Sequence, residues 1–133
     1  MQFNIPELIA RAKKVADKAQ AKYSNFPVGA ALLSTDNRII TGCNVESSSY
    51  GLSICAERVA LVKALSEGIT DFHTMVIYAE KAEYCPPCGA CRQLLFDYAP
   101  NIKIILTNGK EYQSYKLKDL LPHAFEASKL SDK

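Results

Sequence analysis

The chain has 133 residues, of which 16 are basic and 14 acidic, and its net charge is +2. We expect a single domain over residues 1–133, with a loose C-terminal tail from about residue 127. The basic residues form no cluster, which argues against a nucleic-acid partner. No uninterrupted apolar stretch could span a membrane, so we expect no membrane partner either.

Residues 1–68 are predicted to form a helix, two strands and a second helix. Apolar residues at helical spacing predict the first helix over 5–23, with Pro6 in its first turn. Strands are predicted over 28–33 and 38–42, on either side of a polar turn. A polar, serine-rich loop follows at 44–53. The second helix is predicted over 55–67, where Gly68 ends it.

The rest of the chain alternates strands and helices. The predicted elements are a strand over 72–79, a loop over 80–87, a helix over 89–98, strands over 102–107 and 112–115, and a short helix over 117–121. The resulting order, α-β-β-α-β-α-β-β, predicts an α/β fold with a mixed, roughly five-stranded sheet covered by helices. Both cysteine clusters fall at the starts of predicted helices.

Three cysteines have the spacing of a zinc site. Cys88 and Cys91 are three residues apart at a helix start, so their side chains share one face, and Cys55 begins the other helix. A helix N-terminus favours thiolate over thiol. Three thiolates leave one tetrahedral position open, which is typical of catalytic zinc. We therefore predict one Zn²⁺ per chain, held by these three residues.

A fourth cysteine offers an alternative. Cys85 precedes Cys88 by three residues, and a closed site of four cysteines would be structural. Pro86 and Pro87 disfavour this, because their fixed φ angles make a helical turn across them unfavourable.

The N-terminal residues lack the basic flank and apolar run of a signal peptide. We therefore expect a cytoplasmic protein with reduced thiols, in which metal binding is favoured over disulfides.

Two residues beside Cys55 are candidates for the chemistry. Glu57 lies in the first helical turn, where its carboxylate can reach the surroundings of the same ion. On its own it would be interpreted as a surface glutamate at a helix start. Beside an open zinc it is predicted to shuttle protons in metal-assisted hydrolysis. Arg58 is predicted to donate to a thiolate, because Zn²⁺ with three thiolates carries a net charge of −1.

These motifs together resemble a known family. The segments Cys55-Ala56-Glu57-Arg58 and Pro87-Cys88-Gly89-Ala90-Cys91-Arg92-Gln93 are similar to those of zinc-dependent cytidine deaminases, in the all-cysteine form of the small homotetrameric enzymes. That class uses a zinc-activated water and a glutamate that is not a zinc ligand. The resemblance implies hydrolytic deamination of cytidine and deoxycytidine in pyrimidine salvage, by a homotetramer whose sites are completed by neighbouring subunits.

The resemblance also implies a nucleoside-binding set. Phe26, in the segment 23–31, would stack on the pyrimidine, and Asn44 with Glu46 would bind the ribose 3′-hydroxyl. The remaining residues implied to bind substrate are Ala56, Tyr50 and Phe125, of which Tyr50 and Phe125 would reach a neighbouring subunit's site. Ser47-Ser48-Ser49 departs from the family's usual pattern, which bears on sugar binding and leaves the zinc chemistry untouched.

Three other functions remain open at this stage. Deaminases of cytosine-containing antibiotics such as blasticidin S have a similar cysteine pattern, although Phe26, Asn44 and Glu46 favour ordinary nucleosides. A non-enzymatic structural-zinc module would need Cys85 as its fourth ligand. A deaminase of polynucleotides is disfavoured by the weak net charge and the short chain.

Overall fold

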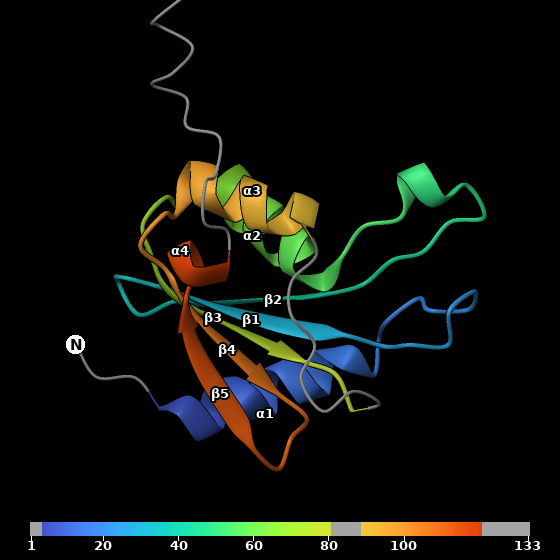
Figure 1. The fold of residues 1–133 in the computed structure, drawn as a ribbon, viewed down its shortest axis with the longest axis horizontal. Helices are drawn as coiled ribbons and strands as arrows, with labels where there is room; N and C mark the ends of the chain where they lie inside the picture. The colour runs from blue at the N-terminus through green and yellow to red at the C-terminus, as the bar shows by residue number, and fades with distance from the viewer. Residues whose placement is uncertain (1–3, 81–88, 121–133) are drawn as a thin grey trace, which may run out of the picture.

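The fold is that of a computed structural model, which describes residues 4–80 and 89–120, with the backbone alone for Tyr50, Gly89 and Ala90. Helices cover both faces of one sheet (Figure 1). The α-helices are α1 (Ile5–Ala16), α2 (Ala56–Ser66), α3 (Gly89–Tyr98) and α4 (Leu117–Leu120), and a 3₁₀ turn, η1, spans Tyr50–Leu52. The strands are β1 (Gly29–Ser34), β2 (Ile39–Cys43), β3 (Phe72–Tyr78), β4 (Lys103–Thr107) and β5 (Tyr112–Lys116).

The sheet is mixed and five-stranded, as predicted. Its strand order is β2-β1-β3-β4-β5. Strands β3 and β4 are parallel, while every other neighbouring pair is antiparallel. The parallel pair requires a crossover, and α3 lies within that connection. None of the helices in residues 4–80 and 89–120 is long and apolar enough to cross a membrane.

Each face of the sheet has its own core. Leu8, Ala12 and Ala16 of α1 pack against one face, on side chains that include Val76 of β3 and Ile105 of β4. On the other face α2, α3 and α4 share a larger core with alternate residues of the same strands. Its members include Leu32, Ala60, Leu61, Ile77, Leu95, Ile104, Leu106 and Leu117. Period-two alternation along the strands therefore supplies both cores.

The predicted first helix was too long. It ends at Ala16, and Asp17 caps it, so residues 17–23 are not helical. The Gln20 amide donates to the Asn44 carbonyl oxygen at 2.9 Å, and the Glu46 amide donates to the Gln20 carbonyl oxygen at 3.0 Å. These bonds to a distant segment replace helical bonds, which local periodicity could not foresee. They place residues 20–26 beside residues 44–46.

The close approach of α1 to the sheet leads to a stability prediction. A Cβ added at Gly29 would lie 1.9 Å from the Ala12 carbonyl oxygen, a backbone atom that cannot rotate away. We expect Gly29→Ala to lower the free energy of unfolding by about 3 kcal/mol. Gly51→Ala is the control, because no heavy atom lies within 4 Å of the added carbon. Denaturant unfolding of both variants checks this, and equal losses would contradict it.

Candidate metal and nucleoside site

The start of α2 carries both Cys55 and Glu57. Cys55 is the N-cap residue of α2, with extended backbone angles, and its side chain makes no capping hydrogen bond. Glu57 lies in the first turn and is only 4% exposed. A helix N-terminus stabilises negative charge, so the same feature favours both a thiolate and a carboxylate here.

The start of α3 brings Cys91 to the same place. Cys91 is fully buried, and helices α2 and α3 pack in the same core. The sulfur atoms of Cys55 and Cys91 and a carboxylate oxygen of Glu57 all lie within 4.8 Å of one another. Residues 36 positions apart in sequence thus converge because two helix N-termini meet.

The chemistry of these donors fits a zinc ion. Thiolates and a carboxylate are ligand types that zinc accepts, and their separation is compatible with one ion between them. A cation bound there would offset the negative charge of the thiolates and the carboxylate. Cys88, the predicted third thiolate ligand, lies outside the described residues, as does Cys85.

Arg58 lies on the same turn of α2 and is half-buried. One of its guanidinium nitrogens donates to the Ser53 carbonyl oxygen at 3.5 Å, a long hydrogen bond that joins α2 to the preceding loop. Its predicted contact with a ligand thiolate stays a prediction.

Three of the predicted nucleoside-binding residues, Phe26, Asn44 and Glu46, lie close together. Asn44 is 8% exposed; its side-chain oxygen accepts from the Val28 amide at 2.9 Å, and its side-chain nitrogen donates to the Phe26 carbonyl oxygen at 3.0 Å. Phe26 is half-buried and packs against the core beneath α2 and α3. Asn44 therefore braces the segment that carries Phe26.

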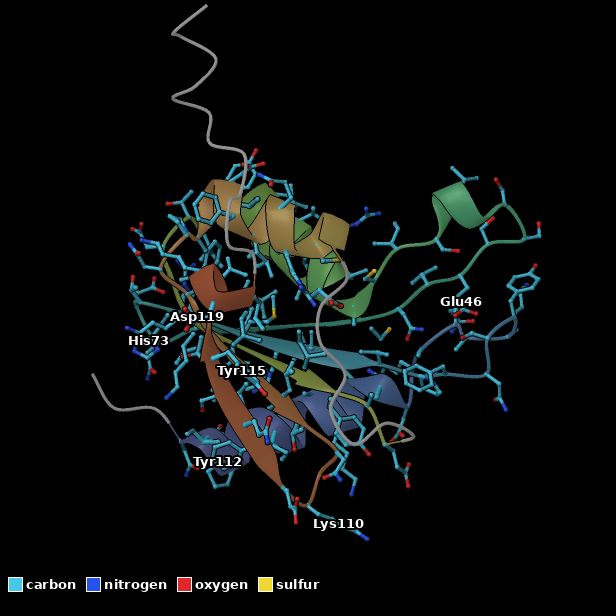
Figure 2. All side chains as sticks on the ribbon, viewed as in Figure 1. Glu46, His73, Lys110, Tyr112, Tyr115 and Asp119 are labelled. Carbon is cyan, nitrogen blue, oxygen red and sulfur yellow. The ribbon has the colours of Figure 1, made fainter. Side chains whose placement is uncertain are left out.

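Glu46 also contacts that segment. Its Oε1 atom accepts from the Tyr23 amide at 3.1 Å and the Ser24 amide at 3.0 Å, and its Oε2 atom accepts from the Ser24 hydroxyl. Figure 2 shows Glu46 on the opposite side of the molecule from His73 and Asp119. The carboxylate lines a cavity of about 270 Å³ with Tyr23, Ser24, Ser47 and Ser53.

These bonds lower the pKa of Glu46 from its ordinary value of 4.5, chiefly through the Ser24 hydroxyl, then the Ser24 amide, with partial desolvation opposing them. A lowered folded-state pKa contributes stability that is present above pH 4.5 and is lost as the pH falls through the folded pKa. We expect wild-type stability to fall more steeply below pH 4.5 than that of Glu46→Gln. Denaturant unfolding of both zinc-free proteins checks this, and parallel pH curves would contradict it.

Of the other predicted substrate-binding residues, the structure describes the side chain of Ala56 alone. Ala56 is fully buried and its methyl group packs in the core, so a contact with substrate would be through its backbone. Tyr50 begins η1, and its side chain is outside the described part of the structure. Phe125 lies outside the described residues.

Sequence reasoning did not single out Ser24. Its hydroxyl donates to Glu46 and accepts from the Phe26 amide at 3.1 Å, so it contacts both a predicted sugar-binding and a predicted base-binding residue. The available signal was a serine two residues before an aromatic, a pattern in which the hydroxyl commonly bonds to the backbone of the second following residue.

The fold and the site together define a class: an α/β protein in which two cysteine sulfur atoms and a carboxylate, at the starts of two helices, are close enough to hold a metal ion. The family model of the cytidine and deoxycytidylate deaminase zinc-binding region matches residues 4–107. A cytidine deaminase of Sporosarcina psychrophila is 41% identical over 131 residues, covering 97% of this chain and 96% of that protein.

Two further relatives extend the comparison. The crystal structure of cytidine deaminase from Burkholderia pseudomallei superposes with a TM-score of 0.89 at 42% identity, covering 92% of this chain and all of that one. A blasticidin-S deaminase of Bacillus cereus is 30% identical over 131 residues, covering 90% of this chain and 94% of that protein. The chain belongs to the cytidine and deoxycytidylate deaminase family, and it is a zinc-dependent enzyme.

Proposed function

We propose that this enzyme hydrolyses cytidine and deoxycytidine to uridine and deoxyuridine with release of ammonia. The observation that carries the proposal is the buried Glu57 carboxylate within 4.8 Å of the Cys55 and Cys91 sulfur atoms. The 41% identity with a cytidine deaminase over nearly the whole chain supports the choice of substrate.

Cys55, Cys88 and Cys91 would hold the ion, with Arg58 offsetting the excess negative charge of the thiolates. When bound, zinc supplies Lewis-acid activation of water at neutral pH. Glu57 accepts a proton from the attacking water and donates it to N3 of the pyrimidine, while the water oxygen bonds to C4. Glu57 then carries the second water proton to the amino nitrogen, the C4–N bond breaks and ammonia leaves.

Four groups would hold the nucleoside. Phe26 lies against the pyrimidine, and Asn44 with Glu46 binds the 3′-hydroxyl of the sugar. The backbone of Ala56 contacts the base. Support for the sugar role comes from the cavity beside Glu46, since a carboxylate there can accept from a hydroxyl.

The test of the function is ammonia release from cytidine, deoxycytidine and blasticidin S by purified, zinc-loaded protein. We expect turnover of both nucleosides and little of the antibiotic. Preferential turnover of blasticidin S would instead assign the chain to the antibiotic deaminases, and turnover of none of the three would refute the proposal.

We further propose that the enzyme is a cytoplasmic homotetramer of single-domain chains acting in pyrimidine salvage. Support comes from the segment 44–54, which projects away from the sheet and helices (Figure 1). Its side chains Val45, Leu52 and Ile54 are 42%, 70% and 37% exposed, which is a feature of subunit interfaces. Tyr50 and Phe125 would then reach a neighbouring subunit's site. Sedimentation analysis should give a tetramer, and a stable monomer would refute this proposal.

A further inference from the structure

The backbone of Phe26 is held at both of its polar groups by side chains. Its amide donates to the Ser24 hydroxyl at 3.1 Å, and its carbonyl oxygen accepts from the Asn44 side chain at 3.0 Å. Between Ser24 and Phe26, Asn25 has a φ of 56°, in the left-handed region. This conformation is uncommon for a residue other than glycine. The two side-chain hydrogen bonds to the Phe26 backbone help to hold the segment in it, and so help to define where the phenyl ring lies.

The Ser24 hydroxyl is the only one of these contacts that also reaches Glu46 in the described structure. It accepts from the Phe26 amide and donates to Oε2 of Glu46. A hydroxyl has one donor and two acceptor positions, so Ser24 can make both bonds together. A shift of the Glu46 carboxylate would therefore move the Ser24 hydroxyl, which holds the Phe26 amide.

Glu46 keeps capacity for a ligand while making these bonds. The segment 23–24 supplies three donors to the carboxylate, from two backbone amides and one hydroxyl. An ionised carboxylate has about four acceptor positions. One position therefore remains for a sugar hydroxyl in the adjoining cavity, without breaking the bonds that hold the segment.

We propose that Ser24 is a positioning residue that couples the sugar-binding carboxylate of Glu46 to the aromatic ring of Phe26. The inference rests on the proposed function, in which Glu46 binds the sugar and Phe26 the base. In this arrangement Ser24 acts on the nucleoside through Glu46 and Phe26, both of which its hydroxyl contacts directly. Ser24 sets nucleoside affinity by keeping Glu46 and Phe26 at the separation that suits the sugar and the base. The chemical step at Glu57 does not depend on Ser24.

The test uses full-length, zinc-loaded enzyme and three variants. Ser24→Ala should raise KM for cytidine about tenfold with little change in kcat, because it removes the two hydrogen bonds that position Glu46 and Phe26 for binding. Ser24→Thr keeps the hydroxyl and should restore a KM near that of wild type. Ser66→Ala is the matched control, since its exposed hydroxyl bonds to the Lys63 carbonyl oxygen at the far end of α2.

A double-mutant cycle separates coupling from a general loss of stability. If Ser24 acts through Phe26, adding Ser24→Ala to Phe26→Ala should change KM far less than it does in the wild type. A full tenfold effect in both backgrounds would overturn the proposal, as would an unchanged KM in Ser24→Ala.

Amide hydrogen exchange tests the contact without relying on turnover. The Phe26 amide should exchange about tenfold faster in Ser24→Ala than in wild type or Ser66→Ala, because it loses its acceptor. An unchanged rate would overturn the inference. Absence of cytidine turnover in the wild type would refute the proposed function, while the exchange rate would still decide whether Ser24 holds Phe26.

Discussion

Glu57→Gln is expected to retain zinc and to lower kcat for cytidine by about 10³-fold, within the range observed when a general acid–base group is lost. Glutamine has nearly the same shape as glutamate, so the buried side chain still fits in the same space. It cannot accept a proton from water at neutral pH or return one to N3. Metal analysis together with steady-state kinetics on the same preparation provides the measurement.

The matched control for this variant is Glu67→Gln. Glu67 is an exposed glutamate that caps the opposite end of α2, so it tests loss of a negative charge on the same helix away from the site. We expect its kcat to equal that of wild type. A Glu57→Gln enzyme that binds zinc and works at nearly the wild-type rate would remove Glu57 from the mechanism.

Cys91→Ala is expected to reduce bound zinc from one per chain to near zero and to abolish deamination. Its sulfur lies within 4.8 Å of the Cys55 sulfur, and removal leaves too few thiolates for a stable site. The chain should stay folded, because the two cores on either side of the sheet do not depend on the metal. Zinc analysis and circular dichroism of the same sample check both statements.

Cys85→Ser is the variant that separates the open zinc site from a closed one. If three cysteines hold the ion, this variant keeps its zinc and its activity. If Cys85 is a fourth ligand, zinc is lost, and the chain would be interpreted as having a structural site. Cys43→Ser is a useful second control, because Cys43 is a half-buried free cysteine that lies outside the Cys55, Glu57 and Cys91 cluster.

Local sequence patterns predicted most of the secondary structure. Apolar spacing and stop signals placed α2 and α3 within a residue or two of their observed bounds, and the Asn108-Gly109 turn correctly indicated that β4 and β5 pair. The one large error was residues 17–23. Their spacing suits a helix, but backbone bonds to Asn44 and Glu46 are made instead, and sequence periodicity carries no information about such distant partners.

In the candidate site too, some features follow from the local sequence and others from the tertiary structure. Residue types and spacing were sufficient to select Cys55, Glu57 and Cys91, because helix starts and metal ligands are short-range features of a sequence. Their meeting depends on how α2 and α3 pack on the sheet, which fixes the distances between residues far apart in the chain. Close approach at Gly42, where an added Cβ would meet the backbone of Ala56 and Ala60 in α2, is part of that packing.

The segments around Phe26 and Glu46 show the clearest contribution of tertiary structure. The sequence indicated by resemblance that Asn44 and Glu46 bind a sugar, and it contained no sign that the same side chains hold the loop bearing Phe26. That second role requires residues about 20 positions apart to lie within hydrogen-bonding distance. Short-range chemistry was therefore determined by the sequence alone, whereas the coupling between distant groups was decided by the packing of the folded chain.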